Sequence, residues 1–324
     1  MKSTMNRRAA LGALGSAAFA GSGPLWAQNW PQRPVRIVVP IAPGGAADAN
    51  ARMVAERLSR ALGQQVFVEN KPGGAGNVGI QAAKSAHDGH TFLFTGNNYP
   101  VNVTLLPQSA YQLDDFVPVI ELARGPSVLV ASPNAAFGSL RELIDQARAS
   151  PGRIAYGSPG IGVPSHIACE LFQYVAKIKL LAIQYRGSGP ALLDAVAGQI
   201  PLAACTLAAA MPHIKAGKLK ALAVTSSARW ESAPDIPTVT EIIQVDCTHL
   251  TWHGILAPRG TPADVVALMN AEINKVLEAP ALREALASQG MNASGGTPQV
   301  MGQMILDEYT SSKELIKAAG IKAE

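Results

Sequence analysis

The sequence predicts an α/β fold of two parallel-rich sheets flanked by helices, with a ligand cleft between two lobes. Apolar strand-like runs alternate with segments of helical periodicity, as in parallel sheets covered by helices. Glycine-rich loops repeatedly join the end of such a run to the start of a helix. Two β-rich passages, 117–131 and 248–257, bracket the middle of the chain, so the chain leaves one lobe and returns to it. Open α/β sheets bind ligands at the carboxyl ends of their strands, which places the cleft between the lobes. The expected boundaries are 28–128 with 250–324 for lobe 1, and 129–249 for lobe 2.

The first unit of the chain, a strand, a glycine turn and a helix, contains the first candidate site. Residues 35–39 are a β-branched run typical of buried parallel strands, and residues 51–62 repeat apolar side chains at helical spacing. Gly44 and Gly45 lie between them and let a ligand approach the backbone. Because the first N–H groups of a helix lack internal partners and attract anions, we expect an anion site here. A turn that only connects two core elements is the alternative.

Two further strands complete a β-α-β-α-β pattern. They are expected at 66–70 and 91–95, and the glycine cluster 73–76 precedes a helix over 78–86. This order of elements predicts a parallel sheet with helices on both faces.

The middle of the chain repeats the same order of elements. A capping box at Ser139 and Glu142 begins a helix that ends before Pro151. Glycine loops then connect strands to helices twice more. The expected strands are 153–156, 180–185, 200–206 and 219–225, and the two glycine loops are 157–165 and 187–190. After residue 260 the pattern is helical, with Thr-Pro helix starts at 261–262 and 297–298.

Residues 1–27 are interpreted as a cleavable signal peptide. Arg7 and Arg8 precede a short apolar run, and Ala27 provides the small residue expected before the cut. The general secretory route and the twin-arginine route both fit this pattern. We therefore expect a periplasmic protein.

The charge of the chain gives no support to nucleic-acid binding. The 324 residues include 27 Lys and Arg against 23 Asp and Glu, a formal charge of +4. Lys2, Arg7 and Arg8 lie in the expected signal peptide, which contains no acidic residue, so the rest of the chain has a net charge of about +1. Binding to nucleic acid requires a clustered basic face.

Catalytic and metal-binding interpretations find little support. Ser158 and Ser188 both lack the Gly-x-Ser-x-Gly spacing of serine hydrolases. His166 and Cys169 are three residues apart, but no two further ligands at suitable spacing complete a zinc site. We expect no catalytic residue, no metal and no cofactor, and a hydrolase that uses a cleft serine is the weaker alternative.

The three cysteines and a pair of histidines are expected to have structural positions. Cys169, Cys205 and Cys247 follow no pairing pattern and are predicted to be small apolar core residues, with one disulfide left open. His249 and His253 lie four apart in a strand-like run and point the same way. We expect surface or core positions for both.

Several short motifs occur in an order and spacing that resemble a known family. They are Trp30-Pro31, Pro43-Gly44-Gly45 with Asp48, Glu69-Asn70-Lys71-Pro72-Gly73, Asp88-Gly89-His90-Thr91, Tyr185-Arg186-Gly187-Ser188-Gly189-Pro190, His213-Ile214-Lys215-Ala216-Gly217 and Ala257-Pro258-Arg259-Gly260-Thr261-Pro262. From about Trp30 to the C-terminus the sequence resembles the Bug (TctC-like) extracytoplasmic solute receptors, the binding subunits of tripartite tricarboxylate transporters. The resemblance implies a two-lobed, type II-like periplasmic binding protein that closes on a small carboxylate. It also implies a monomer that contacts membrane transporter subunits or, alternatively, signals to a membrane sensor kinase.

The resemblance further implies which residues bind the ligand. In this family the carboxylate is held mainly by backbone N–H groups from two facing loops. The implied residues are Gly44, Gly45, Ala46, Ala47 and Asp48 in lobe 1, and Ser158, Gly160, Ile161 and Gly162 in lobe 2. The further candidates are Asn97, Asn98, His166, Ser188, Gly189, Cys205 and Thr206.

Two places depart from the family pattern. Cys205 and Thr206 stand where relatives often have a polar pair, and Asn97-Asn98 stands where they tend to have Ser and Thr. Because Cys205 replaces a candidate acidic partner for a ligand ammonium, we expect a di- or tricarboxylate or an aromatic acid rather than a free amino acid.

Overall fold

The computed structural model describes residues 30–44, 46–106 and 109–322. The predicted signal peptide and Gly45 lie outside the described residues. The strands are β1 (Val35–Val39), β2 (Val66–Asn70), β3 (Thr91–Gly96), β4 (Phe116–Ala131), β5 (Ala155–Ser158), β6 (Leu181–Gln184), β7 (Leu202–Thr206), β8 (Lys220–Val224), β9 (Leu250–Pro258) and β10 (Asn292–Ala293). The helices are α2 (Ala46–Leu62), α3 (Asn77–Lys84), α4 (Asn98–Leu105), α5 (Leu140–Ala149), α6 (Pro164–Ala176), α7 (Ser188–Val196), α8 (Leu207–Lys215), α9 (Val239–Ile243), α10 (Ala263–Leu277), α11 (Pro280–Ser288) and α12 (Pro298–Ala319).

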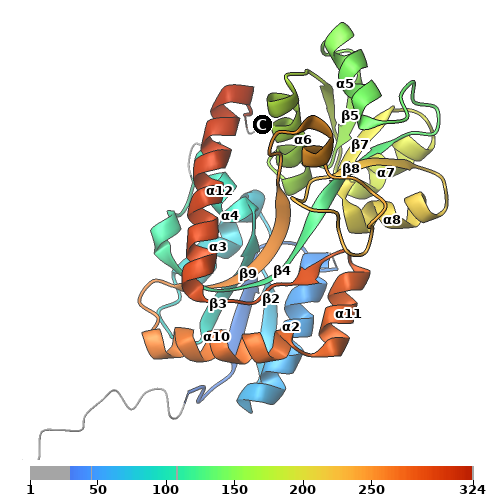
Figure 1. The fold of residues 1–324 in the computed structure, drawn as a ribbon. Coiled ribbons are helices and arrows are strands. Elements are labelled where there is room, and N and C mark those ends of the chain that lie inside the picture. The colour runs from blue at the N-terminus through green and yellow to red at the C-terminus, as the bar shows by residue number, and fades with distance from the viewer. Residues whose placement is uncertain (1–29, 45, 107–108, 323–324) are drawn as a thin grey trace, which may run out of the picture.

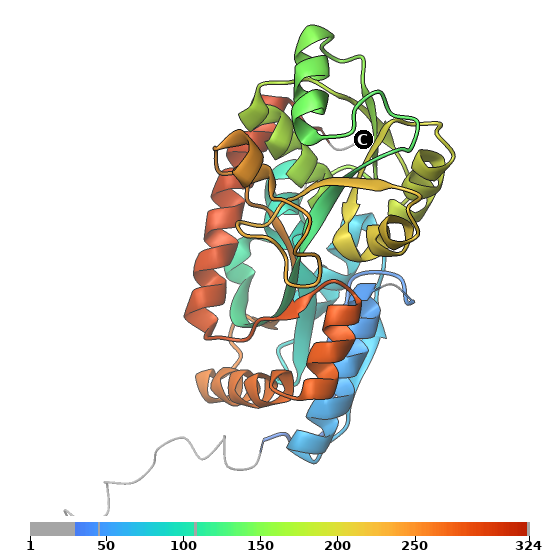
Figure 2. The same ribbon diagram turned by 45° about the vertical axis from the view of Figure 1, so that its right-hand side comes forward.

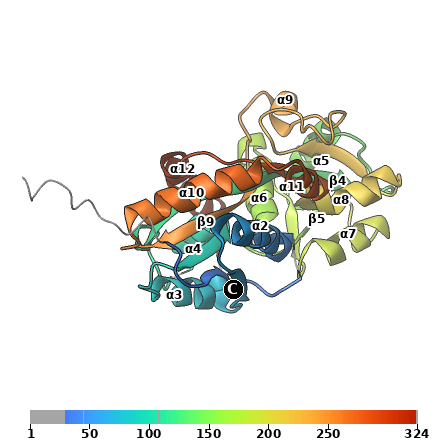
Figure 3. The same cartoon turned by 90° about the horizontal axis from the view of Figure 1, so that it is seen from below.

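The first sheet has the order β2-β1-β3-β9-β4. β1 pairs with β2 and β3 in parallel, whereas β9 joins β3 and β4 in antiparallel register. Side chains alternate between its faces: Ile37 and Phe92 pack with α2, α10 and α11, and Val38 and Leu93 pack with α3, α4 and α12. Seen from below, α10 and α3 accordingly lie on opposite sides of β9 (Figure 3).

The second sheet is built around β5, which pairs in parallel with β6 and β7. One face packs against α5 and α6 through Leu140 and Phe172, and the other packs against α7 and α8 through Leu192 and Leu207. Figure 1 shows this sheet with its helices above the first one.

A single strand, β4, belongs to both sheets. Its first part, Phe116–Pro126, pairs with β9, and its last part, Ser127–Ala131, pairs antiparallel with β7 and β8. The β-rich passage predicted at 117–131 is thus one continuous strand. Since β4 and β9 are antiparallel to their neighbours, both sheets are mixed. α12 packs against both α4 and α6 and so runs beside both sheets (Figures 1 and 2).

Two helix starts differ from the prediction in a way that shapes the site. α2 begins at Ala46 and not near Ala51, so the residues expected in a loop form its first turn. α4, which was not predicted, begins at Asn98 directly after β3.

The cysteines Cys169, Cys205 and Cys247 are free and buried, as expected for core residues. None of the helices in the described part of the chain is long and apolar enough to cross a membrane.

Candidate functional site

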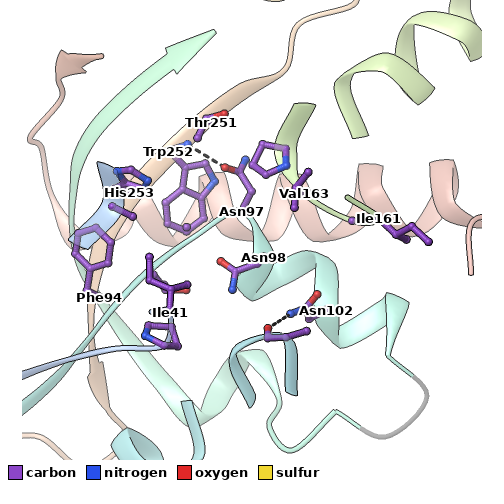
Figure 4. Close-up of a pocket in the computed structure, with 17 residues that line it drawn as sticks. Ile41, Phe94, Asn97, Asn98, Asn102, Ile161, Val163, Thr251, Trp252 and His253 are labelled. Atoms are coloured by element: carbon purple, nitrogen blue, oxygen red, sulfur yellow. Dashed lines mark hydrogen bonds between the residues drawn. The ribbon is translucent and has the colours of Figure 1, made fainter. Parts of the chain in front are cut away.

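A cavity of about 370 Å³ lies where the first turn of α2 and the ends of β1 and β3 meet β9, α4 and the loop before α6 (Figure 4). Its volume falls in the range of small-molecule sites. The lining residues are Pro40, Ile41, Ala47, Ala75, Phe94, Thr95, Gly96, Asn97, Asn98, Asn102, Ile161, Gly162, Val163, Pro164, Thr251, Trp252 and His253. A second cavity of about 110 Å³ shares Ala47, Thr251 and His253 with it.

The turn before α2 is held by Asp48, whose carboxylate faces its own loop. It accepts hydrogen bonds from the Gly44 N–H at 3.0 Å, from Arg52 Nε at 3.1 Å and from Asn70 Nδ2 at 2.8 Å. Burial alone would raise the pKa of Asp48, but the hydrogen bonds from Arg52, Gly44 and Asn70 lower it below its usual value. The expectation that Gly44 and Asp48 face the ligand was therefore wrong, because each is already the other's partner.

The first turn of α2 nevertheless keeps N–H groups for a ligand. Ala46 and Ala47 are its first two residues, and N–H groups there have no intrahelical acceptor. Ala47 lines both cavities and Ala46 lines the smaller one. The positive end of the helix dipole adds to the attraction for an anion.

Two polar side chains of β9, Thr251 and His253, line both cavities together with Ala47. Asn50 Nδ2 is 3.1 Å from His253 Nδ1, and no described residue forms a hydrogen bond with His253 Nε2. Burial lowers the pKa of His253 to about 4, which keeps the ring neutral. Thr251 Oγ1, also in the lining, is buried with no hydrogen-bond partner among the described residues.

The second predicted loop contributes apolar surface to the cavity, and two of its N–H groups are bonded within the protein. Ile161 and Gly162 line the cavity, whereas Ser158 is fully buried and Gly160 lies outside the lining. The Gly160 N–H donates to Ser158 Oγ at 3.4 Å, and the Gly162 N–H donates to His166 Nδ1 at 3.3 Å. The expectation that these two N–H groups face a ligand was wrong, because side chains of the same loop and helix occupy them.

His166 therefore stabilises this loop through the Gly162 N–H and does not itself line the cavity. Its Nε2 lies 3.9 Å from Glu170 Oε1, which also accepts hydrogen bonds from Tyr156 and Gln173. Burial lowers the pKa of His166 and outweighs the opposing effect of Glu170, so Nδ1 accepts from Gly162 in the neutral ring.

Asn97 and Asn98 both line the cavity but differ in what they can offer. Asn97 donates to the Leu250 carbonyl and to Glu308, and its oxygen accepts from the Trp252 N–H, so its amide ties β3 to β9 and α12. Asn98 points toward the cavity (Figure 4), and no described residue forms a hydrogen bond with its side chain.

The remaining candidates fall outside the larger cavity. Thr206 lines the smaller one. Cys205 is fully buried among Val128 and Leu207, and burial raises the pKa of its thiol to about 12, so it is an inert core residue and the prediction of a ligand contact was wrong. Ser188 and Gly189 line neither of these two cavities, so their role at a ligand stays a prediction.

The cavity can bind an anion without any charged side chain. None of its described lining residues is Lys, Arg, Asp or Glu. Within the described residues no group of three His, Cys, Asp or Glu side chains is arranged to hold a metal ion. The available polar groups are the N–H groups at the start of α2, the Thr251 hydroxyl, the His253 ring and the Asn98 amide, of which the sequence indicated the first and the last.

Comparisons with known proteins agree with the geometry. Residues 50–321 match the family described as tripartite tricarboxylate transporter family receptor, TctC. The protein BugT of Bordetella pertussis is 36% identical over 310 residues, which cover 94% of this chain and 95% of that protein. The solved structure of R. palustris Rpa4515 with adipate is 32% identical, with a TM-score of 0.79 over 90% of this chain and 99% of that one. MatC from Rhodopseudomonas palustris with bound malate is 29% identical, with a TM-score of 0.76 over 89% and 100%. The periplasmic binding protein BugD matches with a TM-score of 0.76, which confirms the predicted α/β binding-protein fold.

Proposed function

The chain belongs to the tripartite tricarboxylate transporter family of receptors, and from this membership we propose that it captures a small organic carboxylate in the cavity beside α2. The family consists of solute-binding receptors and not of enzymes. The observation that carries the proposal is the meeting of unpartnered donors in an uncharged cavity: the start of α2, Thr251 and His253. The structures of Rpa4515 with adipate and of MatC with malate support a carboxylate as the class of ligand.

The strength of such a site suits a receptor that must release its ligand. Each charge-assisted hydrogen bond contributes roughly 1.5–3 kcal/mol, and a helix N-terminus adds about 0.3–1 kcal/mol. Several such donors, less the cost of ordering the ligand, correspond to a micromolar complex of about 8 kcal/mol.

The arrangement of the two sheets supplies a way to open and close the cavity. Ile161 and Gly162 approach from the second sheet, whereas Ala47 and Phe94 belong to the first. Movement of lobe 2 (129–249) relative to lobe 1, about β4 and β9, would uncover the ligand. The lobe boundaries are part of this proposal.

The proposed receptor acts in the periplasm and passes its ligand to membrane transporter subunits. Export by the segment 1–27, which lies outside the described residues, is part of the same proposal. The periplasmic binding proteins among the similar structures support the location.

Calorimetry on the exported protein tests the proposal. The full chain is expressed in a bacterial host, purified from the periplasm and titrated with succinate, citrate and benzoate, with glucose as a control. We expect saturable binding of at least one acid, a raised melting temperature and no new product after long incubation. Failure of all three acids to bind, or turnover of an acid or its ester, would contradict it.

A further inference from the structure

On the premise that the protein is a carboxylate receptor, we propose that Glu308 of α12 takes up a proton when an anionic ligand enters the cavity. Glu308 does not line the cavity and acts on the ligand through Asn97 and Trp252, so it is a positioning residue of the proposed site. Its contacts, its burial and its position beside His249 lead to this assignment.

Glu308 is one hydrogen bond away from the residues that line the cavity. Its Oε1 accepts a hydrogen bond from Asn97 Nδ2 at 2.7 Å, and its Oε2 accepts another from the Trp252 ring nitrogen. Asn97 and Trp252 both belong to the lining, and Figure 4 shows them next to each other there. Because a single layer of side chains separates the Glu308 carboxyl from the ligand, a charge on either one affects the other.

The negative charge of Glu308 has neither a Lys nor an Arg partner among the described residues. Its side chain is only 12% exposed, and the basic group beside it is His249. Glu121 of β4 is the other carboxylate that faces it, and Glu121 is itself paired with Arg124. Removal from water without a cation disfavours the ionised form of a carboxyl. Burial accordingly raises the pKa of Glu308 to about 7, so both of its forms are present at neutral pH.

The titratable groups on the other elements around Glu308 are neutral or bonded elsewhere. α4 contributes Tyr99, which is neutral because burial raises its pKa far above the usual value. α6 contributes His166 and Glu170, whose hydrogen bonds join them to the loop before α6 and to β5. On α12 itself, the neighbouring Asp307 is exposed. Glu308 is therefore the group near Asn97 whose proton a ligand charge controls.

His249 supplies the acceptor that a protonated Glu308 requires. Its Nε2 lies 3.8 Å from Glu308 Oε1, and neither of its ring nitrogens has a hydrogen-bond partner among the described residues. Burial lowers the pKa of His249 to about 4, so the ring is neutral and one of its nitrogens has a free lone pair. With its own proton on Nδ1, the ring can accept the carboxyl proton at Nε2. Protonation of Glu308 thus removes a buried charge and gives His249 a partner.

A ligand carboxylate in the cavity favours the neutral form of Glu308. Two negative charges in one poorly hydrated site repel each other, so binding raises the pKa of Glu308 further. By linkage, binding then takes up a proton, and affinity falls as pH rises through the pKa of the free protein. If the ligand raises that pKa by about one, the total fall in affinity is about tenfold.

Proton uptake on binding tests the inference directly. The exported protein is titrated with succinate, adipate and benzoate at pH 7 in a weakly buffered solution with a pH indicator, and calorimetry gives the affinity at pH 6.5 and pH 8.5. The carboxyl groups of these acids are ionised over this range, so a proton that is taken up binds to the protein. We expect about 0.4 protons per bound acid at pH 7, and an affinity about threefold or more lower at pH 8.5 than at pH 6.5.

Glu308→Gln removes the titrating group and keeps its shape. The glutamine oxygen can accept from Asn97, and its amide nitrogen can donate to His249, so the variant should fold. We expect the proton uptake to be lost and the affinity to be nearly the same at pH 6.5 and pH 8.5. Asp307→Asn, on the exposed side of the same helix, is the control and should keep both the uptake and the pH dependence.

The outcomes separate this inference from the proposed function. Binding of an acid without proton uptake by the unchanged protein overturns the inference and leaves the carboxylate receptor in place. Uptake that persists in folded Glu308→Gln also overturns it, because the proton then binds to another group, such as His253, the second histidine of β9. If none of the three acids binds, the inference fails, and the proposed function fails with it when citrate does not bind either.

Discussion

The turn before α2 and the loop before α6 follow the same pattern in the sequence but do different work in the structure. Both are glycine turns between a strand and a helix. Before α2, Asp48 satisfies the Gly44 N–H and leaves the first N–H groups of the helix for a ligand. Before α6, His166 and Ser158 accept hydrogen bonds from the Gly162 and Gly160 N–H groups, and the loop presents Ile161 to the cavity. In the proposed receptor, the first turn holds the anion and the second covers it.

We expect the largest effect on stability when the α2 turn is altered. Replacing Asp48 by Ala removes three hydrogen bonds to a buried carboxylate and leaves the Gly44 N–H and Asn70 without their acceptor. We expect the free energy of unfolding to fall by roughly 2–4 kcal/mol, measured by urea denaturation. Asp145→Ala on exposed α5 is the control and should change it by less than about 0.5 kcal/mol. Equal effects of the two variants would show that the turn is not held as described.

The second prediction compares the α2 end of the cavity, to which Thr251 of β9 belongs, with the loop before α6 by their effect on binding. Thr251→Val keeps the shape of the side chain and removes the hydroxyl at the α2 end of the cavity. Loss of one hydrogen bond to a charged ligand should weaken the best acid about tenfold or more. Ser158→Ala, in the loop before α6, should weaken it less than about threefold, because Ser158 is buried away from the cavity. If calorimetry showed that Ser158→Ala weakens binding more than Thr251→Val, the carboxylate would lie nearer the loop before α6 than the start of α2.

A third prediction concerns the support behind the covering loop. His166→Leu keeps a buried side chain of similar size but removes the acceptor of the Gly162 N–H. We expect ligand affinity to fall a few-fold, because the loop loses its fixed position while every proposed donor to the carboxylate is intact. Faster ligand release with an unchanged association rate would mark this as a positioning effect. Stopped-flow tryptophan fluorescence can measure both rates.

The smallest effect is the pH dependence that His166 introduces. Its pKa is lowered in the folded protein, chiefly by burial, so the unfolded chain binds a proton more readily. The contribution of the neutral ring to stability is present above the unfolded pKa of about 6.5 and is lost as pH falls through the folded value. The decrease in melting temperature between pH 7.5 and pH 5 should therefore be smaller in His166→Leu than in the unchanged protein. An equal decrease in both would contradict this assignment.

Local patterns in the sequence were sufficient for the first unit and insufficient for the far side of the site. The β-branched run before Gly44 and the helical spacing after it depend only on neighbours in the chain, so β1 and α2 could be predicted. The position of His253 depends on the antiparallel pairing of β3 and β9, in which it lies opposite Gly96. A Cβ at Gly96 would lie 2.5 Å from the Trp252 carbonyl oxygen, so that glycine permits the close approach. The spacing of residues within either strand does not predict this pairing. It also does not predict that His166 accepts a hydrogen bond from the loop before its helix.

The continuity of β4 has a mechanical consequence. Because the strand is hydrogen-bonded along its length to β9 and then to β7 and β8, the two connections between the sheets form one ribbon and not two separate tethers. Its pairing with β9 shifts register near Ile120 and Ala123, and irregularities of this kind are where strands bend. Such a pair of hydrogen-bonded strands bends more easily out of the plane of the sheet than within it. The two lobes would then open along one path and close along the same path.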